Sequence, residues 1–296
     1  MTRRSTLGDG HDDHGGLRRD LEALARLQGR RGVLRLFVGA ASAGLLVACG
    51  STPSGADAGG DAGAGGDTTP GGDTAPATDA SATCTTIPQE TAGPYPGDGT
   101  NSANGSVANV LTQTGVVRSD LRPSFGGLSG TAEGVPMTVR LRLRRASDCA
   151  ALAGAAVYLW HCDREGRYSL YSAGVTTQNY LRGVQVADAD GVVTFRTIFP
   201  GCYDGRMPHI HFEVFRALAE ATTGRGALRT SQLALPLDAC NAAYATTGYG
   251  ASVTNLARIS FERDMVFSDG YALQLASITG DAASGYVATL EVTVAA

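Results

Sequence analysis

Residues 137–143 read MTVRLRL, and this stretch sets the fold class of the chain. Apolar Met, Val and Leu side chains alternate with Thr and Arg. A period of two is typical of a strand with one buried face and one solvent-exposed face. Residues 286–294, YVATLEVTV, show a second long alternation. Shorter runs with strand character occupy residues 155–161, 192–198, 209–215 and 230–235.

Turn signals separate these runs, at residues 163–166 (DREG), residues 188–191 (DADG) and Pro200-Gly201. Many short strands with few helical stretches favour an all-β protein. The sequence therefore predicts an antiparallel β-sandwich with long loops and little helix. We expect a short helix within residues 215–229 or 238–246.

The amino-terminal part has the features of a targeting segment. Residues 30–35, RRGVLR, precede an apolar run that ends at Ala48, shorter than the ~20 residues that span a bilayer. Leu46-Val47-Ala48-Cys49 resembles the bacterial lipoprotein processing box, which implies a lipid on Cys49. The paired arginines resemble a twin-arginine export signal. Residues 1–49 are thus expected to export and anchor a protein that faces the periplasm or the cell exterior. A plain anchoring helix or a general secretion signal with incidental arginines is the alternative.

Residues 50–82 consist almost throughout of Gly, Ala, Asp, Thr, Ser and Pro. Such a composition cannot bury enough apolar surface to offset chain entropy, so it predicts a disordered tether. Residues 83–296 remain as the expected folded domain. The formal charge of −4 argues against nucleic acid as a partner, and the lipid is the only membrane contact that we expect.

The stretch that carries chemistry is residues 199–215, FPGCYDGRMPHIHFEVF. Alternate residues of a strand share a face, so His209 and His211 point the same way and can bind one metal ion. Tyr203 lies six residues before His209, and Tyr168 follows a turn further upstream. Tyrosinate oxygen together with imidazole nitrogen suits iron(III) better than zinc or copper(I).

Several short motifs occur in a fixed order along the chain. They are Gly93-Pro94-Tyr95, Trp160-His161-Cys162-Asp163, Gly166-Arg167-Tyr168, residues 181–185, Pro200-Gly201-Cys202-Tyr203, Arg206, His209-Ile210-His211 and residues 230–232. The set resembles the intradiol ring-cleavage dioxygenases, which include catechol 1,2- and protocatechuate 3,4-dioxygenases. The resemblance covers most of residues 84–235 and is nearest to the secreted subgroup.

The resemblance implies an iron(III) ion as the cofactor, with hydroxide as a further ligand. Its four protein ligands would be Tyr168 and His209 in equatorial positions and Tyr203 and His211 in axial positions. Tyr203 would leave the metal and act as a general base when the substrate binds. Arg206 would stabilise developing negative charge, and Gln232 would lie near the O₂ position.

The implied substrates are O₂ and a small aromatic diol. Both oxygen atoms would enter the catechol-type ring and give a cis,cis-muconate. Gly93, Pro94 and Tyr95 would line the substrate pocket. The sequence leaves the particular catechol and the oligomeric state open.

Each candidate residue also has a plainer interpretation. Tyr168 and Tyr203 could be core aromatic residues, and Arg206 could be a solvated turn residue. On that interpretation the chain is a catalytically silent, transthyretin-like binding module on the cell surface. A copper or manganese oxidase would need more ligands, but only His161 remains outside the targeting segment, and a structural role is expected for it.

Five cysteines follow Cys49, and the odd number leaves at least one of them free. Cys202 stands where the family commonly has Trp. A disulfide from Cys202 to Cys149 or Cys240 is the candidate pairing, and Cys162 is expected to be buried and free.

Overall fold

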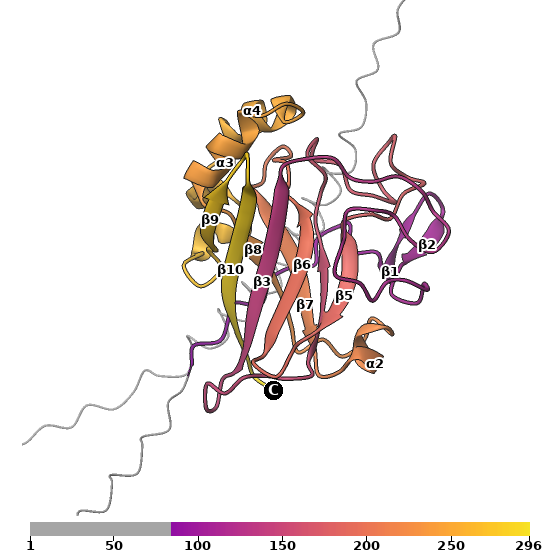
Figure 1. Ribbon diagram of the computed structural model, residues 1–296, viewed down its shortest axis with the longest axis vertical. Coiled ribbons are helices and arrows are strands. Elements are labelled where there is room, and N and C mark those ends of the chain that lie inside the picture. Colours follow the sequence, from indigo (N-terminus) through magenta and orange to yellow (C-terminus); the bar gives the residue numbers. More distant parts are fainter. Residues whose placement is uncertain (1–83) are drawn as a thin grey trace, which may run out of the picture. The chain divides into compact units, whose positions relative to one another are not determined.

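The computed structural model describes residues 84–296 (Figure 1). The expected export signal, including Cys49, and the expected tether of residues 50–82 lie outside the described residues. Within the described part of the chain, no helix has the length and apolar character needed to cross a bilayer.

Two four-stranded sheets form the body of the domain. The first has the order β6-β3-β10-β9, from β6 (Val192–Ile198), β3 (Pro136–Arg145), β10 (Gly285–Val294) and β9 (Ser277–Asp281). The second has the order β5-β4-β7-β8, from β5 (Arg182–Val186), β4 (Ala156–Trp160), β7 (His209–Phe215) and β8 (Arg229–Ala234). A separate hairpin pairs β1 (Asp98–Ala103) with β2 (Ser106–Asn109).

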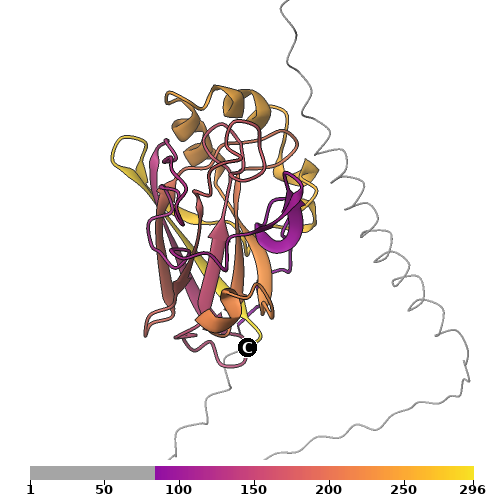
Figure 2. The ribbon, with the colours of Figure 1, turned by 90° about the vertical axis from the view of Figure 1, so that its right-hand side faces the viewer.

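Little of the described chain is helical. The helices are α2 (Leu218–Ala221), α3 (Leu237–Tyr244) and α4 (Gly250–Leu256), with 3₁₀ turns η1 (Phe261–Arg263) and η2 (Phe267–Asp269). Both regions where a helix was expected contain one, whereas α4 was not expected. Figures 1 and 2 show α3 and α4 at one end of the sandwich and α2 near the other.

The predicted β-sandwich is confirmed, with one departure from an antiparallel arrangement. The two longest strands, β3 and β10, pair in parallel, from Met137 opposite Tyr286 to Arg145 opposite Val294. The other pairs in both sheets are antiparallel. A parallel pair needs a long crossover, and here most of the domain lies between the two strands.

The main core lies between the sheets. Met137, Val139 and Leu141 of β3 share it with Ile210 and Phe212 of β7. These are the apolar residues of the alternating stretches, and each fully buried aliphatic or aromatic side chain contributes about 1.5–3 kcal/mol. The odd-numbered residues of β7 therefore face away from this core.

A second apolar cluster covers the outer face of β4 and β5. Trp160 and Tyr158 of β4 pack there with Tyr168 and with loop residues such as Val110 and Leu111. Every residue of β7 is consequently buried, because the inter-sheet core covers one face and loops cover the other. The outer face of β7, which carries His209 and His211, therefore lies under these loops and outside the inter-sheet core.

The disulfide expectation for Cys202 is wrong, because the disulfide joins Cys84 to Cys149. Cys162, Cys202 and Cys240 are free and buried, which confirms the expectation for Cys162. Strands β3 and β6 are antiparallel, so Cys149, just after β3, and Cys202, just after β6, lie towards opposite ends of the sheet.

Candidate metal centre

His209 and His211 lie on the outer face of β7, as the alternation predicts. Both side chains are almost fully buried, and their Nε2 atoms are 3.1 Å apart. The His209 Nδ1–H donates to the Met207 carbonyl at 2.6 Å, which leaves a lone pair on Nε2. The His211 ring stacks on Trp160 with ring centroids 5.0 Å apart, so β4 holds its orientation.

Tyr203 reaches the same point from the loop after β6. Its hydroxyl lies 3.2 Å from His209 Nε2. The loop requires glycine at position 201, because a Cβ there would lie 2.7 Å from the Arg164 carbonyl oxygen and 2.8 Å from that of Asp163. This close approach joins the Tyr203 loop to the loop that carries Tyr168.

Tyr168 arrives from the long loop after β4. Its ring lies edge-on to Tyr203, with centroids 5.8 Å apart, and edge-on to His211 at 6.3 Å. Its hydroxyl is buried beside Tyr203 and makes no well-formed hydrogen bond. A buried polar atom without a partner is costly, and a metal ion would satisfy it.

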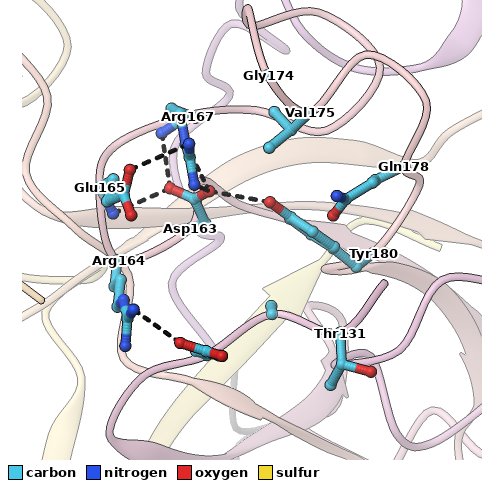
Figure 3. A pocket seen from close by; sticks show the side chains of 11 residues that line it. Thr131, Asp163, Arg164, Glu165, Arg167, Gly174, Val175, Gln178 and Tyr180 are labelled. Atoms are coloured by element: carbon cyan, nitrogen blue, oxygen red, sulfur yellow. Dashed lines mark hydrogen bonds and ion pairs between the residues drawn. The ribbon is translucent and has the colours of Figure 1, made fainter. Parts of the chain in front are cut away.

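The Tyr168 loop is held by the carboxylate of Asp163 (Figure 3). This carboxylate accepts hydrogen bonds from the backbone N–H groups of Glu165 and Arg167 at 2.9 and 3.0 Å. It also accepts from the Arg167 guanidinium at 3.0 Å and from the Tyr180 hydroxyl at 2.9 Å. These groups line a polar pocket of about 190 Å³ behind the loop. Asp163 therefore fixes the turn that delivers Tyr168.

The donor atoms fit a single metal ion. Two ligands about 2.1 Å from one ion and at right angles to each other lie about 3.0 Å apart, close to the 3.1 and 3.2 Å observed. His209 Nε2 has one lone pair but two neighbours at these distances, and a shared cation resolves the conflict. Among the described residues, no group of three or more His, Cys, Asp or Glu side chains could hold a metal. The present set instead combines two histidines with two tyrosines.

Burial decides the protonation of these ligands. Desolvation lowers the pKa of His209 and of His211 well below the ordinary value, so both rings are neutral and can donate a lone pair. Desolvation raises the pKa of the Tyr168 and Tyr203 hydroxyls, and the Arg206 guanidinium only partly opposes it. Both tyrosines therefore need a nearby cation to ionise, as iron(III) would provide.

Arg206 and Gln232 form a connected pair beside the tyrosines. Arg206 is 6% exposed, and its Nη2 donates to Gln232 Oε1 at 2.7 Å. Gln232 Nε2 in turn donates to the Thr91 carbonyl at 3.0 Å. Arg206 is therefore a buried, hydrogen-bonded cation rather than a solvated turn residue.

Asp264 is a site residue that the sequence analysis missed. Its fully buried carboxylate binds Arg206 Nε at 2.9 Å, across 58 positions of sequence. In the sequence, Asp264 is followed directly by the apolar residues Met265, Val266 and Phe267. A carboxylate that is buried among such residues requires a partner, and this pattern could have indicated Asp264.

The segment with the expected pocket residues lies over the ligands. A Cβ on Gly93 would lie 3.3 Å from His211 Cε1, and the Tyr95 ring centroid is 4.7 Å from that of Tyr168. The fully buried Arg182 donates to the carbonyls of Tyr95 and Pro96 at 2.9 Å. Asn101 donates to the carbonyl of Pro94. These contacts hold residues 93–96 against the site.

His161 does not join the donor set. Its Nε2 lies 2.6 Å from Thr197 Oγ1 and its Nδ1 lies 2.7 Å from the Cys162 carbonyl oxygen, so both ring nitrogens are already bonded. Its environment is that of a structural histidine.

Part of the chain is similar in sequence to known dioxygenases. Residues 125–227 match a family model described as Dioxygenase. Chlorocatechol 1,2-dioxygenase of Pseudomonas sp. (strain P51) is 32% identical over 97 residues, which cover 27% of this chain and 38% of that protein. The match thus spans about two fifths of that relative.

Solved structures extend the comparison to the whole domain. An intradiol ring-cleavage dioxygenase from Tetranychus urticae has a TM-score of 0.54 at 22% identity, over 71% of this chain and 95% of that chain. A second solved dioxygenase has a TM-score of 0.50 at 25% identity, over 60% of this chain and 86% of that chain. Residues 125–227 thus resemble a dioxygenase family, and the described domain has the fold of the intradiol ring-cleavage dioxygenase from Tetranychus urticae.

Proposed function

We propose that this chain is a non-haem iron(III) intradiol dioxygenase that opens the ring of a small aromatic diol with O₂. The observation that carries the proposal is the convergence of two tyrosine and two histidine side chains on one point, beside a buried arginine. A binding module would not need this combination. Both oxygen atoms would enter the product, a cis,cis-muconate.

The ion would be held by Tyr168, Tyr203, His209 and His211. Iron(III) would supply Lewis acidity that makes the diol hydroxyls acidic and the ring reactive towards O₂. Trp160 and the Met207 carbonyl hold the two imidazoles in place, and Asp163 holds the turn before Tyr168.

Tyr203 has the features of the mobile general base. It is partly exposed, whereas Tyr168, His209 and His211 are buried. Tyr203 could therefore move aside for substrate, and its phenolate oxygen, ionised beside a bound cation, could accept a proton from a diol hydroxyl. Because burial raises the pKa of Tyr203, the hydroxyl formed in this way would keep its proton.

Arg206 would stabilise negative charge on the substrate. Its Nε and Nη2 are bound to Asp264 and Gln232. A cation fixed in a dry site stabilises developing charge without having to reorganise during the reaction. Tyr95, beside Tyr168, offers an aromatic wall to the substrate ring.

We also propose that the domain works outside the cytoplasm on a lipid anchor at Cys49. The processing box of residues 46–49 supports the anchor, and the Cys84–Cys149 disulfide supports an oxidising compartment. The arginine pair favours the twin-arginine route, which exports folded proteins.

The visible spectrum of the purified, iron-loaded full chain tests the proposed function, before and after catechol is added under air. We expect a tyrosinate-to-iron charge-transfer band that shifts with catechol, followed by a cis,cis-muconate product. A colourless protein that stays inert after reconstitution with iron would instead indicate the silent binding module.

A further inference from the structure

Asp264 is a fully buried carboxylate whose hydrogen bonds converge on the site. It lies between η1 and η2, in the segment that follows α4. Its Oδ1 accepts from the backbone N–H groups of Val266 and Phe267 at 2.8 and 3.2 Å, which fixes the carboxylate on its own turn. Both carboxylate oxygens then face Arg206.

Two of the three guanidinium nitrogens of Arg206 donate hydrogen bonds to buried side chains. Nε donates to Asp264 at 2.9 and 3.1 Å, and Nη2 donates to Gln232 at 2.7 Å. Nη1 takes no part in these bonds. The Phe267 ring lies 5.7 Å from the guanidinium carbon. Two rigid partners thus leave Nη1 as the nitrogen that can meet a substrate anion.

The same carboxylate also supports a metal ligand. Asp264 Oδ2 accepts from the Met207 N–H at 2.6 Å, and the Met207 carbonyl accepts from His209 Nδ1 at 2.6 Å. A hydrogen bond behind a ligating histidine sets its ring orientation and tautomer. Asp264 therefore reaches both Arg206 and His209 without contacting the point where the ligands converge.

We propose that Asp264 is a positioning residue, which aims the Nη1 group of Arg206 at the substrate. The inference rests on the proposed dioxygenase function. Asp264 lies outside residues 125–227, the part that matches the family model. The geometry therefore assigns to the carboxyl-terminal segment of this chain a part in a site whose other members lie before residue 233.

The first test compares Asp264→Asn with Asp269→Asn in the full chain. An asparagine in place of Asp264 would keep the side-chain volume and one oxygen, which can accept either from the Met207 N–H or from the N–H groups of its own turn, and it would lose the charge that binds Arg206. We expect kcat per bound iron to fall at least about tenfold in Asp264→Asn, with the iron content and the KM for catechol within about threefold of wild type. Asp269 is exposed on η2, and its variant should match wild type. Unchanged kcat per iron in Asp264→Asn would overturn the proposal.

A double variant separates positioning from a merely structural role. If Asp264 acts through Arg206, then Arg206→Met with Asp264→Asn should be no slower than Arg206→Met alone. If the double variant instead showed the product of the two single losses in kcat, the proposal would be contradicted. Should Asp264→Asn fail to fold, Arg206→Lys replaces it, because lysine has a single terminal nitrogen, which cannot occupy the three separate positions of the guanidinium nitrogens. Wild-type kcat in Arg206→Lys would contradict the role proposed for the guanidinium geometry.

A measurement that needs neither iron nor turnover keeps the test of Asp264 distinct from the test of the proposed function. NMR of the metal-free full chain should show that the Arg206 Nε–H is protected from exchange with solvent. The same proton should lose that protection in Asp264→Asn. If wild type binds iron but leaves catechol intact, the proposed function fails while this result still decides the positioning. Equal exchange in both proteins would refute it.

Discussion

Tyr203 differs from the other candidate ligands by its partial exposure. Tyr203→Phe removes only the hydroxyl, so three donors remain to hold the iron. We expect the variant to keep most of its iron and to lose about 100-fold in kcat, the lower range for a general base. Iron analysis and oxygen uptake measure the two quantities. Wild-type turnover would exclude the general-base role.

The two kinds of buried histidine provide a matched comparison. His209→Ala should purify with little iron and without the charge-transfer band, because Nε2 faces both Tyr203 and His211. His161→Gln should keep the band and only unfold at a lower temperature, since His161 bonds Thr197 and the Cys162 carbonyl. Full iron occupancy in His209→Ala would contradict its place as a ligand.

Gly93 combines a φ of +69° with a close approach to His211. Gly93→Ala should cost about 1 kcal/mol of stability and press on the imidazole, which raises the KM for catechol and shifts the absorption band. Gly105→Ala is the control, because its φ of +79° is similar but its Cβ would meet nothing within 4 Å. Equal KM values in the two variants would show that the contact with His211 has no consequence.

At the scale of elements, the segment of residues 84–97 links both sheets to the site. Ile87 donates to the Thr293 carbonyl of β10 at 2.9 Å, and Glu90 donates to that of Thr230 on β8 at 2.8 Å. The disulfide fixes the start of this segment, and Thr91 and Gly93 near its end contact Gln232 and His211. The segment thus connects the turn after β3 to the candidate metal centre.

Removal of the disulfide tests this link. Cys84 and Cys149 are 65 positions apart, so Cys84→Ser with Cys149→Ser should lower the free energy of unfolding by about 4 kcal/mol. The released segment should also be cleaved sooner by protease, and the KM for catechol should rise. Denaturant unfolding and limited proteolysis measure these effects. An unchanged KM would show that the backbone bonds to β8 and β10 suffice to hold the segment.

At the scale of the whole molecule, the proposed anchor and the folded domain make separate predictions. Cys49→Ser should move the protein from the membrane fraction to the soluble fraction, because the lipid would have no attachment point. Its kcat should equal that of wild type, because the proposed site lies within residues 91–264. Unchanged fractionation of Cys49→Ser would refute the anchor.

Strand periodicity, motif order and residue chemistry were readable in the chain alone. Residues 137–143 and 286–294 predicted two half-buried strands, since alternation follows from strand geometry whatever the partner. The His-x-His spacing placed two imidazoles on one face for the same local reason. The proposed ligand set follows from the resemblance to a family rather than from periodicity.

Only the tertiary structure decided which distant segments meet. The parallel pairing of β3 with β10, the Cys84–Cys149 disulfide and the contact of Asp264 with Arg206 join positions 58 or more apart, and local pattern carries no information about such pairs. The tertiary structure also decided that the site lies on the outer face of β7, because the loops that cover this face are irregular and have no sequence period. Local sequence determines which face of a strand is apolar, whereas packing of the whole chain determines what covers the other face.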